Sequence, residues 1–353
     1  MKNKLIFFIA FCATIMVSCG TYYRISTTIE RDESATRKAY VWGDSLFMSG
    51  DLSHNPYFFN LEGWELERLD SVGSYDYFGK HKSYNAIVSR NAISLDSLSE
   101  NVLYPDEKRA LALPEESLKS KFKWFYTDFI YSAVFRKPDY HVPAPIENYL
   151  SEEEQVLWTQ GDFTDYSHMN GAELSEMMDG IEEKIIEWYC RNSFLISMAI
   201  MDSVSGYEIP DDDIESMYKA LKSADKDYII IEPSKAKNSL DSFYDTGRFS
   251  AIYYANQNAI DNEFEKQLWV TDLLDIFILY ELDVPGKITA TNAPYCVDGN
   301  MKWKVNGMRV FLKDYSLSAS YRIVNVWAFI ISGLIVIATI FLVVSIIIKK
   351  TGE

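Results

Sequence analysis

The C-terminal apolar run at residues 326–348 limits what this chain can fold into more than any other feature. It contains 23 consecutive residues without a charge. A helix that rises about 1.5 Å per residue needs roughly 20 such residues to cross a hydrocarbon core about 30 Å thick. In lipid, a lone segment satisfies its backbone groups only as a helix. The run therefore predicts a transmembrane helix over residues 324–348, and the alternative is a buried core helix of a soluble domain.

The charges that flank this run predict its orientation. Lys349 and Lys350 follow it, whereas Arg322 and the interfacial residue Trp327 lie at its other end. Because cytoplasmic flanks carry an excess of lysine and arginine, we expect the tail at residues 349–353 to be cytoplasmic and the preceding chain to lie outside.

The N-terminus predicts export. Residues 1–18 combine Lys2 and Lys4, an apolar stretch too short to span a bilayer and a small residue at the end, which is typical of a signal peptide. The sequence Met-Val-Ser-Cys-Gly at residues 16–20 resembles a bacterial lipobox and implies lipidation of Cys19; the alternative is ordinary secretory cleavage. With the C-terminal helix, this predicts a protein of the bacterial inner membrane whose bulk, residues 19–321, lies in the periplasm.

Composition excludes some partners. The formal net charge is −17, which excludes non-specific nucleic-acid binding because a phosphate backbone requires a basic footprint. An acidic domain also repels anionic headgroups, so we expect it to stand off the bilayer unless a local basic patch intervenes. Two cysteines remain beyond the signal region, Cys190 and Cys296. They form either a disulfide, which the periplasm permits, or two buried free thiols.

The patterning predicts one α+β domain in which N- and C-terminal strands form one sheet near the membrane and a long helical region lies between them. Strands are expected at about residues 21–90 and 286–316, and helices at about residues 105–284. The early strands include residues 21–28, 35–42 and 84–89. The late strands are residues 287–291, 301–305 and 308–312, joined by tight turns at Asp298-Gly299-Asn300 and Asn306-Gly307.

Helix signals fill the middle of the chain. Pro105 and Pro114 both precede acidic residues, and apolar residues spaced by three and four predict a helix from Pro114 through Val134. A capping box at Ser151 starts another helix. Further helices are expected at residues 172–201, 214–221 and 255–282.

The C-terminal strands also carry a family resemblance. The ending of LppM-like bacterial envelope proteins is similar to this pattern, which comprises Pro285-Gly286-Lys287-Ile288, Asn292-Ala293, Gly299-Asn300 and Trp303-Lys304-Val305 before the apolar run. Glu33 replaces the glycine of that family's early hairpin. The resemblance implies a signal or lipobox, an extracytoplasmic α+β domain, a C-terminal helix, and binding of lipid or glycolipid without catalysis.

No motif predicts a catalytic residue, a metal site or a cofactor. The four histidines lie in separate segments without metal-ligand spacing, and neither a G-x-S-x-G elbow nor a phosphate loop is present. If the protein is an enzyme nevertheless, the alternative function is an envelope glycan hydrolase that uses two carboxylates facing each other across a cleft.

The sequence thus predicts a non-enzymatic, membrane-anchored periplasmic protein that binds a hydrophobic or lipid ligand or a protein partner. An acidic exterior favours a basic partner. Two aromatic groups are candidates for binding, and ordinary core packing is the alternative for each of Phe58, Phe59, Trp64, Trp124 and Phe125.

Overall fold

The computed structural model describes residues 21–99, 102, 111–161, 163–224, 231–270, 273, 276–297 and 299–351. The predicted signal peptide, the lipidation site Cys19, the helix start expected at Pro105 and the turn residue Asp298 lie outside the described residues.

The larger of two sheets brings the two ends of the domain together, in the strand order β3-β4-β2-β1-β7-β10-β9. The central strands β1 and β7 are parallel, and the remaining neighbours are antiparallel. This confirms the prediction that N- and C-terminal strands share a sheet. The strands are β1 (Thr21–Ile29), β2 (Ala35–Val41), β3 (Glu65–Tyr77), β4 (Lys80–Ala92), β7 (Ile276–Asp283), β9 (Tyr295–Val297) and β10 (Asn300–Asn306).

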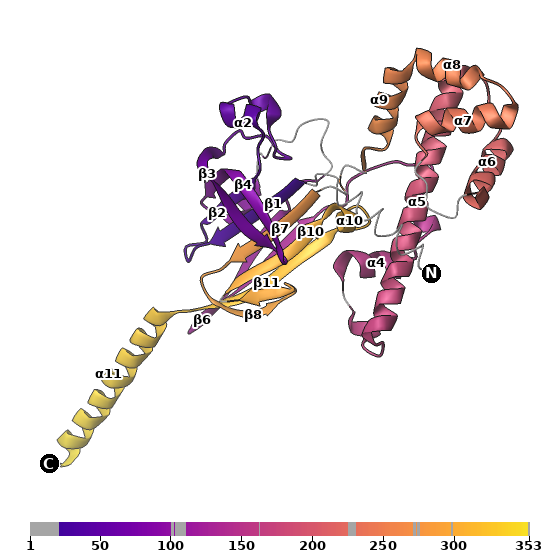
Figure 1. The fold of residues 1–353 in the computed structure, drawn as a ribbon. Coiled ribbons are helices and arrows are strands. Elements are labelled where there is room, and N and C mark those ends of the chain that lie inside the picture. The colour runs from indigo at the N-terminus through magenta and orange to yellow at the C-terminus, as the bar shows by residue number, and fades with distance from the viewer. Residues whose placement is uncertain are drawn as a thin grey trace.

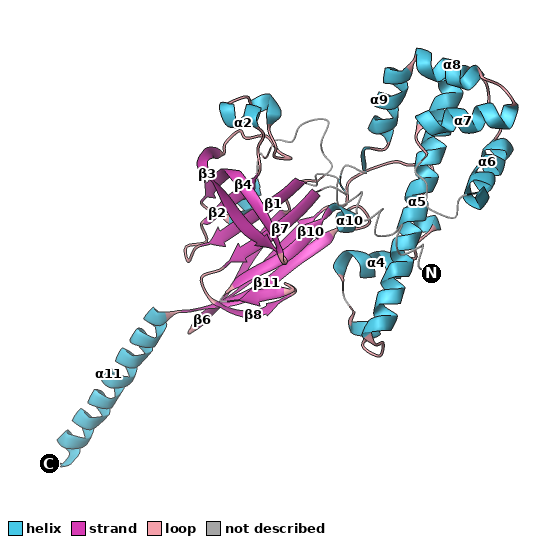
Figure 2. Cartoon of the chain, in the orientation of Figure 1, coloured by secondary structure: helices cyan, strands magenta, loops and turns pink. Residues whose placement is uncertain are grey.

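A second, antiparallel sheet, in the order β5-β6-β11-β8, packs against the first (Figures 1 and 2). Its strands are β5 (Glu115–Lys123), β6 (Tyr126–Phe135), β8 (Lys287–Thr291) and β11 (Tyr315–Val324). Alternate residues of both sheets enter one hydrophobic core, in which the rings of Phe135 and Tyr280 lie 5.9 Å apart. We refer to the two sheets together as the body.

The helices of the middle region, α4 to α9, form a lobe beside the body (Figure 1). The helix α5 is 35 residues long and contributes to two cores: Ile181 and Trp188 pack into the body, whereas Phe194 and Met198 pack among α6 to α9. It therefore joins the lobe to the body. The longer helices are α4 (Glu152–Gln160), α5 (Gly171–Ser205), α6 (Asp211–Ala224), α7 (Pro233–Tyr244), α8 (Arg248–Ala255) and α9 (Gln257–Gln267).

Short helical turns complete the described elements: α2 (Ser45–Ser49), α3 (Leu95–Ser99), α10 (Gly307–Val310), η1 (Leu52–His54), η2 (Ile146–Asn148) and η3 (Thr164–Tyr166). The capping box at Ser151 is confirmed, because its side chain accepts from the Glu154 amide while Glu154 accepts from the Ser151 amide. The helices predicted at residues 172–201 and 214–221 are confirmed as parts of α5 and α6.

The strands predicted at residues 21–28 and 35–42 are also confirmed, and they pair as the β1–β2 hairpin. Burial alternates along β1 and β2, and Asp32 in the connecting turn accepts hydrogen bonds from the amide and hydroxyl of Ser34. Glu33 takes a φ of 69°, in the left-handed region that favours glycine.

The helix predicted from Pro114 to Val134 is wrong, because this segment forms the β5–β6 hairpin. Phe129, Tyr131 and Ala133 are buried at a period of two, which suits a strand. The spacing of three and four on which the helix prediction rested is carried partly by residues of opposite faces, such as the exposed Ile130. The partner strand β11 lies far along the sequence, so local periodicity did not indicate the pairing.

The helix predicted at residues 255–282 is also wrong beyond α9. Its last part is β7, the strand between β1 and β10 at the centre of the larger sheet. Residues 278–282 are buried without interruption, because the far half of the β3–β4 hairpin covers the outer face of β7 around Leu279. A strand buried on both faces reads as a continuous apolar run, which periodicity alone does not distinguish from a buried helix.

The tight turn and strand predicted from Asn306 to Leu312 are replaced by α10. The Asn306 side chain caps this helix by accepting from the Arg309 amide. Gly307 lies so close to Leu273 that a Cβ atom at this position would be 1.7 Å from the Leu273 carbonyl oxygen. The strand β11, which ends at Val324, was not predicted beyond residue 316.

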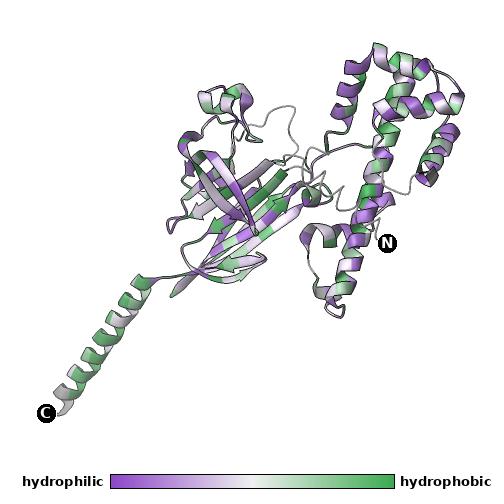
Figure 3. Cartoon of the chain, in the orientation of Figure 1, coloured by the Kyte–Doolittle hydropathy of each residue, from purple (hydrophilic) through white to green (hydrophobic). Residues whose placement is uncertain are grey.

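The apolar run forms α11 (Val326–Thr351), which directly follows β11. Figures 1 and 3 show this helix leaving the body on the side opposite the lobe, with apolar residues along its length. Residues Val326–Ile347 are long and apolar enough to cross a membrane.

Candidate membrane-contact site

An aromatic cluster joins the tip of the β5–β6 hairpin to the start of α11. Trp124 and Phe125 form the two-residue connection between the paired residues Lys123 and Tyr126. The ring centroids of Trp124 and Trp327 lie 5.3 Å apart, and those of Phe125 and Phe329 lie 4.7 Å apart. Trp124 and Phe125 nevertheless remain 45% and 41% exposed, so the tip presents apolar surface to its surroundings.

Hydrogen bonds fix the same hairpin tip to α11. The backbone amide of Asn325 donates to Phe125 O at 2.9 Å, and its side-chain amide donates to Lys123 O at 2.9 Å. The indole Nε1 of Trp124 donates to Ser332 Oγ at 2.9 Å. Ser332 lies six residues after Val326, so the hairpin tip runs beside roughly the first 9 Å of the helix. We call these contacts the clasp.

The clasp sets the depth of the hairpin relative to any bilayer that α11 crosses. The 22 residues from Val326 to Ile347 have a helical length of about 33 Å, close to the roughly 30 Å of a hydrocarbon core. If they fill that core, Trp327 lies at its boundary, where indole rings are favoured because they combine an apolar body with a polar N–H. The Trp124 indole then reaches from this boundary along the helix to Ser332.

Basic side chains lie next to the clasp on the face of the smaller sheet that points away from the hydrophobic core. Asp128 is shared by two of them, at 2.9 Å from Lys123 Nζ and 2.7 Å from Arg322 Nε. The hydrogen bond from Arg322, and then that from Lys123, lowers the pKa of the Asp128 carboxyl. The Arg322 guanidinium also lies 3.8 Å from the ring centroid of Tyr126.

The structure separates the aromatic residues that the sequence singled out. Trp124 and Phe125 lie at the clasp, whereas Phe58, Phe59 and Trp64 are buried in the body. The rings of Phe58 and Phe59 are 5.3 Å apart, and those of Phe59 and Trp64 are 4.8 Å apart. For these three residues the alternative of ordinary core packing therefore describes the structure.

The two cysteines are free thiols. Cys190 is buried in α5, and Cys296 is exposed on the edge strand β9. No disulfide joins them in the structure.

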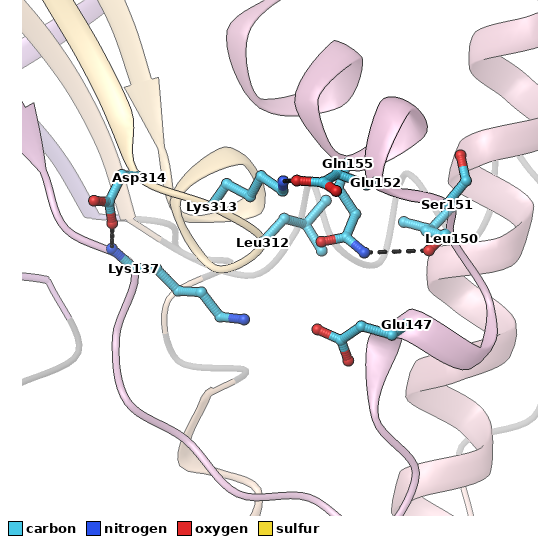
Figure 4. A pocket seen from close by; sticks show the side chains of 9 residues that line it. All are labelled: Lys137, Glu147, Leu150, Ser151, Glu152, Gln155, Leu312, Lys313 and Asp314. Atoms are coloured by element: carbon cyan, nitrogen blue, oxygen red, sulfur yellow. Dashed lines mark hydrogen bonds and ion pairs between the residues drawn. The ribbon is translucent and has the colours of Figure 1, made fainter.

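A pocket of about 710 Å3 lies between the body and α4, and it contains three carboxylates (Figure 4). Two of them are paired with cations: Glu152 with Lys313 at 2.9 Å and Asp314 with Arg136 at 2.6 Å. The Lys313 ammonium lowers the pKa of Glu152. For Asp314, partial burial acts to raise the pKa, but hydrogen bonds from the Lys137 amide and Arg136 outweigh it, so the pKa of Asp314 is lowered as well. A glycosidase acid needs a raised pKa, so neither group suits that role. The third carboxylate, Glu147, points into the pocket opposite Lys137.

Among the described residues, no three His, Cys, Asp or Glu side chains gather closely enough to hold a metal ion. The His54 ring nitrogen Nδ1 lies 2.8 Å from Asp44 Oδ2, at the surface near α2.

Sequence reasoning missed the parts of the site that depend on pairing between distant strands. Asn325 and Ser332 acquire their roles only because β11 brings them to the hairpin tip. The alternation Lys119-Ser-Lys121-Phe-Lys123 is a period-two signal that a strand assignment of this segment would have shown as one basic face.

Fold and site together define a two-sheet α+β body with a helical lobe, fixed by an aromatic clasp to an apolar helix. No protein-family model and no curated protein matches the sequence. Among solved structures, the chain is similar to the folded domain of LppM from Mycobacterium tuberculosis, determined by NMR, with 7% sequence identity and a TM-score of 0.28 over 87% of this chain and 91% of that one. A TM-score this low does not indicate a shared fold, so the proposals below rest on the residues of this chain.

Proposed function

We propose that this chain is a non-enzymatic, membrane-anchored protein of the bacterial envelope that holds its helical lobe in the periplasm as a binding element for another envelope protein. The observation that carries the proposal is the clasp. Because the hairpin tip is bonded to Asn325 and to Ser332 of α11, the body is held in a defined position at the start of the apolar helix. The lobe then projects on the opposite side of the body (Figure 1).

The sequence supports the orientation. Lys349 and Lys350 after the apolar helix favour a cytoplasmic tail, and the signal peptide with Cys19 favours export and a lipid anchor at the other end. One lipid chain attaches a protein only marginally, whereas a transmembrane helix is effectively permanent. In this proposal α11 places the protein in the inner membrane and a lipid on Cys19 adds a second attachment.

The distal end of the lobe has the chemistry of a partner site. Exposed rings of Tyr207 and Phe243 lie there, and each contacts Tyr244, at centroid distances of 5.5 and 5.1 Å. Two acids lie beside them: Asp213 accepts a hydrogen bond from the Tyr244 hydroxyl at 2.6 Å, and Asp245 ends α7, while the Arg248 guanidinium lies 5.7 Å from the Tyr207 ring centroid. An exposed aromatic patch among carboxylates suits a partner that combines apolar and basic side chains.

Orientation is tested with cysteine labelling. A maleimide that does not cross membranes should label the exposed Cys296 in intact spheroplasts, whereas a Thr351→Cys variant should gain its additional label only after lysis. The reverse pattern contradicts the periplasmic placement of the body.

Partner binding is tested by photo-crosslinking in living cells. A benzophenone amino acid at Phe243, which is 44% exposed, should form discrete adducts, and the same amino acid at Val72 on β3 of the body, which is 61% exposed, should not. Equal adduct formation at both positions would contradict a specific role for the lobe.

A further inference from the structure

We propose that the outer face of the smaller sheet, next to the clasp, binds the anionic phospholipid headgroups of the membrane that α11 crosses, a proposal that rests on the anchoring proposed above. We call this surface the basic face. It comprises the five cationic residues Lys119, Lys121, Lys123, Lys287 and Arg322.

The strand register places these side chains on one surface. Inward positions of β6 and β11, such as Tyr131 and Tyr321, are buried in the core, so the alternate positions point outward. Lys121 lies opposite Asp128, Asp128 opposite Arg322, and Arg322 opposite Lys287. These four residues therefore form a row across all four strands.

The basic face has an excess of positive charge. Asp128 balances part of the charge of Lys123 and Arg322. Lys119, Lys121 and Lys287 are exposed and form no ion pair within the described parts of the chain. A cluster of this sign is unexpected in a chain whose formal net charge is −17. General solubility does not require it, because the acidic residues already supply a large net charge.

The position of this face matches a headgroup layer. Lys123 precedes the tip residue Trp124 directly, and each second residue along β5 lies about 7 Å further from the tip. The basic side chains therefore begin at the level where the aromatic clasp meets the membrane boundary. Each lysine or arginine near an anionic surface contributes about 1 kcal/mol of attraction, a factor of about five in affinity. The basic face is the local patch that allows an acidic domain to approach such a surface.

The test uses the full chain in a neutral detergent and measures lipid retention by native mass spectrometry. Titration with phosphatidylglycerol and with phosphatidylcholine should give preferential retention of phosphatidylglycerol. The triple variant Lys119→Gln/Lys121→Gln/Lys287→Gln leaves the Asp128 ion pairs in place. We expect it to lower phosphatidylglycerol affinity about fivefold per lysine, on the order of 100-fold in total.

The matched control is Lys38→Gln/Lys219→Gln/Lys266→Gln, which removes the same charge from exposed positions on the larger sheet and the lobe. We expect its lipid retention to equal that of the wild type. The proposal is overturned if the control loses as much lipid as the basic-face variant, or if the wild type retains both lipids equally. It is also overturned if inorganic phosphate competes for the site as well as phosphatidylglycerol does at equal concentration.

A second experiment, on membranes, separates the headgroup proposal from the proposal of the membrane anchor. Membranes that contain the full chain are washed with alkaline carbonate, which releases proteins that are bound only peripherally to the bilayer. A chain that stays in the membrane but shows no preference for phosphatidylglycerol contradicts the headgroup site alone. A chain that the wash releases contradicts the membrane anchor.

Discussion

The guanidinium of Arg37 on β2 and the carboxylate of Glu116 on β5 form an ion pair that joins the two sheets, and both side chains are fully buried. Tyr131 donates to the same carboxylate at 2.7 Å and lies 2.8 Å from the hydroxyl of Tyr280. Arg37 Nε donates to Thr27 at 3.1 Å. Burial, followed by the adjacent Glu116 charge, raises the pKa of Tyr131 well above its ordinary value, so this tyrosine remains a hydrogen-bond donor.

Replacement of Glu116 by alanine should strongly destabilise the body. The variant leaves the Arg37 guanidinium buried without its carboxylate, and such a change costs about 3–5 kcal/mol of unfolding free energy. Thermal unfolding of the full chain in detergent, followed by tryptophan fluorescence, measures the effect. The double variant Arg37→Met/Glu116→Leu removes both charges and should recover most of the stability. A double variant as unstable as Glu116→Ala would show that the unpaired charge is not the cause.

Local signals predicted the elements whose structure depends on neighbouring residues. The β1–β2 hairpin follows from alternation around a polar turn, and α4 follows from the capping box at Ser151. The central part of α5 has its apolar stripe at helical spacing, with Ile181, Ile185 and Trp188 buried. In each case the interactions that define the element lie within a few residues of one another.

Elements that depend on distant partners were not predictable in this way. The strand β7 is buried between β1 and β10, and β6 pairs with β11 in a register that joins Phe135 to Tyr315. The strand β7 is covered on both faces and so loses the alternation that identifies a strand. In β6 the alternation is present, but apolar residues such as Ile130 also stand on its exposed face and complete a helical spacing by coincidence. The site shows the same limit: Trp124 and Phe125 were recognised as binding candidates, but their position beside α11 depends on β11.

Gly307→Ala should destabilise the body because no space exists for a methyl group. The added Cβ atom would lie 1.7 Å from the backbone oxygen of Leu273, which a side-chain rotation does not relieve. We expect a loss of about 3 kcal/mol or more in unfolding free energy, at the upper end for overpacking. Gly180→Ala in α5 is the control. Beyond the helix's own backbone and the neighbouring residues, nothing lies within 4 Å of its added Cβ, and alanine should stabilise this helix by about 0.5–1 kcal/mol. Similar losses in both variants would contradict the close approach at Gly307.

Asn325→Ala should loosen the clasp without unfolding the body. It removes the side-chain donor to Lys123 O at 2.9 Å and to Trp124 O at 3.3 Å, and the acceptor of the Thr127 hydroxyl at 3.3 Å. The backbone amide still donates to Phe125 O. The loss of these partly exposed bonds together costs about 1–2 kcal/mol, so amide exchange at residues 122–128 should become roughly tenfold faster. Hydrogen–deuterium exchange of the full chain in detergent measures this. Asn238→Ala, at an exposed position of α7, is the control and should leave the hairpin unchanged. Unaltered exchange in Asn325→Ala would mean that the side-chain bonds do not hold the tip.

Cys190 and Cys296 should differ sharply in reactivity. Burial, with a smaller contribution from Glu187, raises the pKa of the Cys190 thiol to about 12. At pH 8 roughly one Cys190 in 10,000 is then the reactive thiolate. Labelling with a maleimide and peptide mass spectrometry should therefore find Cys296 modified and Cys190 intact until a denaturant is added.

The same shift predicts how stability depends on pH. Unfolded Cys190 ionises near pH 8.5, whereas the folded thiol keeps its proton to about pH 12, so its contribution to stability is complete below pH 8.5 and is lost as the pH rises toward 12. Cys190→Ser removes this ionisation, and its unfolding free energy should fall less than that of the wild type between pH 8.5 and 10. If both cysteines resist labelling in denaturant until a reductant is added, they are joined by a disulfide and the buried free thiol is refuted.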